Sequence, residues 1–67
     1  MTYVDLQPSD FRAVRVRLGD GRWAEGSLEA YRTVGGVWSG YVRYSTGPGN
    51  NHLDWLVEAR IRGGPLG

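Results

Sequence analysis

The stretch "VRVRLGDGRWAEG", residues 14–26, decides the fold that this sequence predicts. Its first five residues alternate strictly between aliphatic side chains and arginine, the pattern of a strand with one buried and one exposed face. A three-residue loop, residues 19–21, places Val16 opposite Ala24 and Val14 opposite Gly26, whereas a two-residue loop would place Glu25 opposite Val16 on the core face. We therefore predict the three-residue loop, because a one-residue slip reverses every side chain.

A second hairpin is predicted over residues 29–45, "EAYRTVGGVWSGYVRYS". We expect residues 34–36 to form its loop, which turns Trp38 toward the core. The same register places Arg32 opposite Trp38, near the turn, where a guanidinium can lie on an indole and still reach water.

The rest of the chain predicts a small all-β domain. Four predicted segments come after the second hairpin: a turn at "STGPGNN" (45–51), a fourth strand at "HLDWL" (52–56), one helical turn at "VEA" (57–59) and a fifth strand at "RIR" (60–62). Gly26 and Gly40 lie inside strands and indicate sharp curvature or close backbone approach. We expect one domain, residues 1–67 with a core of about 12–62 and flexible ends, folded as a five-stranded, strongly bent antiparallel barrel.

Composition excludes several classes of function. The 67 residues include eight arginines, no lysine, no cysteine and one histidine, with a net charge of +1. One histidine and no cysteine are too few donors for a zinc site, so we expect no metal and no cofactor. No apolar run approaches a membrane span, and residues 1–10, "MTYVDLQPSD", have neither the basic nor the apolar region of a signal peptide. We therefore expect a cytoplasmic protein without a membrane partner. The all-arginine bias is typical of a GC-rich bacterial genome.

Catalysis is not expected from this chain. His52 and Asp54 share one face of a predicted strand and have a serine nearby, which resembles part of a hydrolytic relay. A nucleophile also needs a base within reach and an oxyanion site in a pocket that excludes water, which so short a barrel can hardly enclose. We therefore predict that the protein is not an enzyme.

Arginines of the first and last strands form the first candidate binding surface. Arg15, Arg17, Arg60 and Arg62 have the parity opposite to the core residues, and in barrels of this kind the two strands pair. The resulting basic stripe matches phosphate or carboxylate oxygens, because arginine presents a planar fork of donors. The alternative is a solvated face whose arginines pair with glutamates, which are Glu25, Glu29 and Glu58.

Aromatic rings form the second candidate surface. We expect Trp23, Tyr41 and Trp55 to be partly exposed, where they could contact a protein or stack on bases. The register predicted for the second hairpin places the side chains of Tyr44 and Trp38 on the core face of the sheet. For Trp23, two interpretations stay open: a structural plug that stacks on Arg17, or part of a binding platform.

Three segments carry a resemblance to a known class of domain: "VRVRLGDGRWAEGSLEA" (14–30), "YVRYSTGPGNN" (41–51) and "WLVEARIR" (55–62). Together they resemble small barrels of Src-homology-three-like topology, and most closely the Tudor group. The resemblance implies that a cage for methylated lysine or arginine would be built at five positions, which are Arg17, Ala24, Tyr44, Pro48 and Asn50. Only one of these is a ring, so the sequence departs from the pattern that such a cage requires.

These surfaces support three hypotheses, in order. The first is a protein or peptide adaptor that uses Arg17, Trp23, Tyr44 and Trp55 with the loop of residues 47–51. The second is a DNA- or RNA-binding barrel that uses the arginine stripe. It ranks lower because a net charge of +1 gives little overall attraction to the many phosphates of a nucleic acid. The third is a homo-oligomer that buries the exposed rings.

Overall fold

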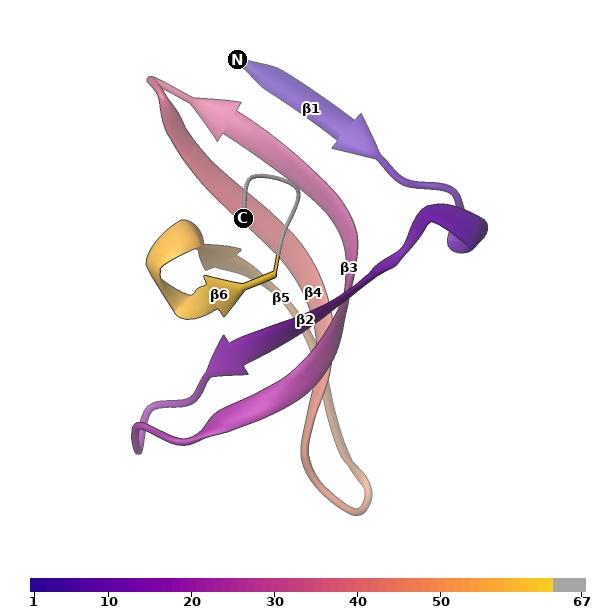
Figure 1. Ribbon diagram of the computed structural model, residues 1–67, viewed down its shortest axis with the longest axis vertical. Coiled ribbons are helices and arrows are strands. Elements are labelled where there is room, and N and C mark those ends of the chain that lie inside the picture. Colours follow the sequence, from indigo (N-terminus) through magenta and orange to yellow (C-terminus); the bar gives the residue numbers. More distant parts are fainter. Residues whose placement is uncertain (64–67) are drawn as a thin grey trace.

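The structure, a computed structural model, describes residues 1–63, which form one antiparallel sheet (Figure 1). Its strands are β1 (Thr2–Asp5), β2 (Arg12–Arg17), β3 (Trp23–Val34), β4 (Val37–Gly47), β5 (Asn50–Val57) and β6 (Ile61–Arg62), with 3₁₀ turns at Pro8–Asp10 and Glu58–Arg60. The prediction of an all-β class is confirmed. The single helical turn before the last strand is also present, shifted by one residue from the segment predicted.

The sheet has six strands, so the prediction of five is wrong. The additional strand is β1, whose residues pair with the far half of β3, from Ala30 to Thr33. β2 pairs with the near half only, from Trp23 to Leu28. A strand as long as β3 therefore needs a second partner on this edge, because its backbone groups would otherwise lose their hydrogen bonds.

The hydrogen-bonded order is β5-β4-β3-β2-β6, and it remains an open path. Within residues 1–63 no pairing joins β5 to β6, so the structure has a strongly bent sheet where we predicted a closed barrel. The last strand is only two residues long and pairs with β2. Figure 1 shows β3 and β4 curving together along the length of the molecule.

The first hairpin has the predicted register. Val16 faces Ala24 and Arg15 faces Glu25, as a three-residue loop requires. The amide of Leu18 donates to the carbonyl of Arg22 at 2.7 Å, which closes the loop. Gly21 has a φ of 89°, a left-handed conformation that glycine adopts without steric cost.

The second hairpin differs from the prediction. Its loop is Gly35–Gly36, with φ values of 58° and 80° that suit a two-residue hairpin turn. The register shifts between Leu28 and Ala30. As a result Leu28 faces Val42, the partner that a loop at residues 34–36 would also have given it. Glu29 is the extra residue of this β-bulge, and beyond it Arg32 faces Ser39 instead of Trp38.

The core lies on the concave side of the sheet. Its buried members are Val14, Val16, Leu28, Trp38, Val42, Leu56 and Ile61. The predicted inward orientation of Trp38 is confirmed, since only 4% of it is exposed. Close approach at both strand glycines is confirmed: a Cβ on Gly26 would lie 2.9 Å from the carbonyl oxygen of Arg43, and one on Gly40 would lie 2.7 Å from Leu28 Cδ1.

Candidate functional site

One exposed apolar surface lies on the convex side of the sheet, beyond the bulge. Of the residues that the structure describes, the large hydrophobic side chains classed as exposed are Met1, Tyr3, Val34, Val37 and Val57. Strand register places the last four on one side, because cross-strand partners share a face and alternate residues return to it. We call this surface the aromatic face and define it as Tyr3, Arg32, Val34, Val37, Tyr41, Trp55 and Val57.

Ring contacts hold the middle of the aromatic face together. Trp55 lies with its ring centroid 5.0 Å from that of its cross-strand partner Tyr41 and 6.0 Å from that of Tyr3. Tyr3 comes from β1 and Trp55 from β5, so these rings meet across β3 and β4. The guanidinium carbon of Arg32 lies 4.2 Å from the centroid of the Trp55 ring. The face therefore combines two half-buried rings, Tyr41 and Trp55, with the exposed ring of Tyr3 and exposed valines around them.

The arginines of β2 and β6 come together as the sequence predicted. The two strands pair, and Arg15 lies directly opposite Arg62. Trp23 is the cross-strand partner of Arg17, but the guanidinium over its ring belongs to Arg62, at 4.3 Å from the centroid. The predicted stack of Arg17 on Trp23 is replaced by this contact, because the pairing of β6 with β2 brings Arg62 to the same convex side.

Arg60 has an internal role. Its Nε and Nη2 donate to the carbonyl oxygen of Arg17 at 3.0 and 2.8 Å, which ties the turn before β6 to the end of β2. In the part of the chain that the structure describes, ion pairs join Arg22 to Asp20 and Arg43 to Glu29, both at 2.6 Å. The four stripe arginines make no such pair there. Three glutamates were predicted as possible partners of the stripe, which are Glu25, Glu29 and Glu58. Among residues 1–63 only Glu29 forms an ion pair with an arginine, and that arginine, Arg43, lies outside the stripe.

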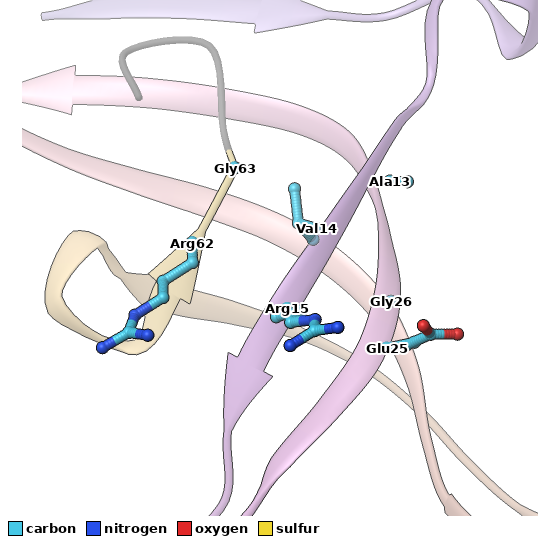
Figure 2. Close-up of a pocket in the computed structure, with 7 residues that line it drawn as sticks. All are labelled: Ala13, Val14, Arg15, Glu25, Gly26, Arg62 and Gly63. Atoms are coloured by element: carbon cyan, nitrogen blue, oxygen red, sulfur yellow. The ribbon is translucent and has the colours of Figure 1, made fainter.

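A pocket opens beside the paired arginines (Figure 2). Its volume is about 400 Å³, and residues that line it include Val14, Arg15, Glu25, Gly26, Arg62 and Gly63. Arg15 occupies the middle strand of this site, with Arg62 opposite it on β6 and Glu25 opposite it on β3. We call this site the arginine pocket.

Tyr44 lies apart from both surfaces, at the outer end of the β4–β5 hairpin. Its ring packs against the core and stacks on His52, with centroids 5.2 Å apart, and its hydroxyl donates to Asp54 at 3.1 Å. Burial, and then this hydrogen bond, raise the pKa of Tyr44 above its ordinary value. The imidazole of His52 contacts the hydroxyl of Thr46 at 3.2 Å, so the carboxylate and the imidazole have different partners.

The residues predicted to bind are thus distributed over three places. Tyr41 and Trp55 lie on the aromatic face, and Tyr44 lies at the hairpin end. The stripe arginines and Trp23 lie around β2 and β6. Sequence reasoning did not identify Tyr3, Arg32, Val34, Val37 and Val57 as members of a surface. The two valines that flank the Gly-Gly turn, Val34 and Val37, were the available signal, whereas β1 has no alternating pattern.

Comparison of the chain with protein-family models, curated proteins and solved structures finds no match in any of the three. No helix within residues 1–63 is long and apolar enough to cross a membrane. The same residues contain no group of three or more His, Cys, Asp or Glu side chains placed to hold a metal ion.

Proposed function

We propose that this protein is a small, non-catalytic binding module that docks a protein or peptide partner on the aromatic face. One observation carries the proposal: the exposed large hydrophobic side chains of β1, β3, β4 and β5 all lie on one side of the sheet. Scattered apolar residues on a surface need no explanation, whereas a contiguous group indicates an interaction site.

The chemistry of the aromatic face suits a protein partner. Tyrosine, tryptophan and arginine are enriched in protein interfaces, and rings that are already packed lose little conformational freedom on binding. Val37 and Tyr3 are 58% and 56% exposed, so a partner would remove a large apolar area from water. The proposed surface shares Trp55 with the adaptor surface predicted from the sequence and adds Tyr41, a ring that was predicted to be partly exposed. It excludes the loop of residues 47–51 and three predicted members, which are Arg17, Trp23 and Tyr44.

We also propose that the bent sheet is an open relative of the Src-homology-three-like and Tudor barrels. Support comes from the meander β2-β3-β4-β5, the 3₁₀ turn after it and the pairing of β6 with β2. Recognition of methylated cations does not form part of the proposal. Tyr44 is engaged by His52 and Asp54, and an arginine of this chain lies over each of Trp23 and Trp55.

Nucleic-acid binding through the arginine stripe is the less favoured function. Arg60 donates from Nε and Nη2 to the backbone carbonyl of Arg17, so one of the four stripe arginines already uses donors within the chain. A duplex binder would lose affinity steeply with salt, with a slope of about 0.9 per phosphate contacted. Titration with duplex DNA at two salt concentrations distinguishes this function from docking on the aromatic face.

Site-specific photocrosslinking in the native host tests the proposed function. A benzophenone amino acid replaces Val37 or Val57 on the aromatic face, and Arg12 or Asn51 as exposed control positions outside it. We expect the two face positions to capture the same partner and the controls to capture none. Adducts that are equally frequent at all four positions, or absent from the face, would refute docking there.

The oligomeric alternative is resolved by the same experiment. An adduct between two copies of this chain, together with a dimeric mass in sedimentation at micromolar concentration, would assign the face to self-association. A monomeric mass and a heterologous adduct would support the adaptor.

A further inference from the structure

Two arginines from paired strands, Arg15 and Arg62, line the arginine pocket. The pairing of β2 with β6 sets Arg15 directly opposite Arg62, and like charges in this position destabilise a sheet. Neither guanidinium has a carboxylate within ion-pair distance among residues 1–63. An anion bound in the pocket that both residues line would offset this excess of positive charge.

The arginine pocket also has room for an anionic group. It is a hollow of about 400 Å³ lined in part by Arg15 and Arg62, and two of its other lining residues are glycines, Gly26 and Gly63. Figure 2 shows the pocket residues on three adjacent strands, with Arg15 between Arg62 and Glu25. A ligand that lies across these strands would therefore meet two cations and then one carboxylate.

Arg62 is oriented before any ligand arrives. Its guanidinium carbon lies 4.3 Å from the centroid of the Trp23 ring. Stacking uses the flat face of a guanidinium and leaves its N–H edge available, so the contact restrains the side chain without consuming its donors. Preorganisation of this kind lowers the entropy lost on binding.

Glu25 adds one negative charge to the lining of the arginine pocket. With two arginines and one glutamate the pocket has a net charge of +1, which matches a monoanion better than a phosphate dianion. A phosphodiester offers no N–H donor to the carboxylate of Glu25. The end of a peptide offers both groups, a terminal carboxylate for Arg15 and Arg62 and backbone N–H groups for Glu25.

We propose that the arginine pocket binds the C-terminal carboxylate of a peptide. This site lies around β2 and β6, whereas the aromatic face is built beyond the bulge of β3, so the proposal does not rest on the proposed function. The two proposals can be tested independently, because the aromatic face and the arginine pocket share no residue.

A pair of small peptides tests the proposal. The full-length protein, labelled with ¹⁵N, is titrated with N-acetyl-glycylglycine as the free acid and then with the same peptide as its C-terminal amide. We expect the free acid to produce saturable shifts at the Nε–H groups of Arg15 and Arg62 and at the amide of Gly63. The amide form should produce none of these shifts.

Matched variants assign the effect to the two arginines. Arg15→Gln and Arg62→Gln should each weaken binding of the free acid about tenfold, because each removes a charge-assisted hydrogen bond. Arg12→Gln removes the same charge from an exposed position on β2 outside the pocket and should leave the dissociation constant unchanged. Unperturbed amide spectra elsewhere show that each variant is folded.

Three results would overturn the proposal. The first is equal binding of acid and amide, and the second is an equal loss in Arg12→Gln and Arg62→Gln. The third is tighter binding of inorganic phosphate or a single-stranded oligonucleotide than of the free acid. A gain in phosphate affinity on Glu25→Gln, with no gain for the peptide acid, would support selection by this carboxylate.

Discussion

Gly26→Ala should destabilise the protein through contacts that cannot relax. The new Cβ would lie 2.9 Å from the carbonyl oxygen of Arg43, 2.9 Å from Val42 Cγ1 and 3.1 Å from Tyr44 Cβ. Gly26 is paired with β2 on one side and with β4 on the other, so relief of the contact with the carbonyl requires the strands to move apart. Overpacking typically costs roughly 1–3 kcal/mol, and the loss of chain entropy in the unfolded state returns about 0.4–1 kcal/mol.

The net loss is therefore about 1–2 kcal/mol, a large part of the roughly 3–5 kcal/mol that a core of this size supplies. Urea unfolding followed by tryptophan fluorescence measures it, and thermal unfolding should show a Tm lower by about 5–15 °C. Gly19→Ala is the matched control, since a Cβ at that position would meet nothing within 4 Å. A Gly26→Ala protein as stable as the Gly19→Ala control would refute the reasoning.

Three further predictions concern other parts of the molecule. Gly21→Ala should lose about 1 kcal/mol in urea unfolding, because φ is 89° there, and Gly21→Asn should lose less, since asparagine tolerates this conformation. Burial and Asp54 raise the folded-state pKa of Tyr44, so the stability it contributes is fully present below the unfolded pKa of about 10 and is lost as pH rises through the folded value. Wild type should thus weaken more than Tyr44→Phe in denaturation between pH 9 and 12. Val37→Ser and Val57→Ser should each change the free energy of unfolding by no more than about 0.5 kcal/mol, because both side chains are exposed. If one valine is replaced by serine while the crosslinker occupies the other position, a loss of the crosslinked partner therefore reports weaker binding.

The first hairpin could be predicted from sequence because only one register was acceptable. A two-residue loop would have placed the Glu25 carboxylate on the core face, and no other feature of the sequence favoured that loop. The loop sequence supplied glycine at the position that requires a left-handed backbone, Gly21. Burial, turn chemistry and alternation therefore agreed.

The second hairpin lacked such a discriminating residue. Both sides of β3 beyond Leu28 have apolar side chains, with Tyr31 on one and Val34 on the other, so either register keeps an acceptable core. The bulge at Glu29 depends on how the strand bends around the core, which no local pattern encodes. The aromatic face was missed for the same reason, since its members were assigned without the bulge and without β1.

Contacts between arginine and tryptophan limit what the two half-buried indoles can recognise. A nucleobase or an alkylated amine that approaches Trp23 or Trp55 has to displace Arg62 or Arg32, each tethered beside its ring. A tethered competitor acts at a local concentration in the millimolar range, so weak stacking ligands are displaced while larger surfaces can still bind. Small aromatic or cationic molecules should therefore have a lower affinity for these two rings than they would for a tryptophan without an arginine stacked on it.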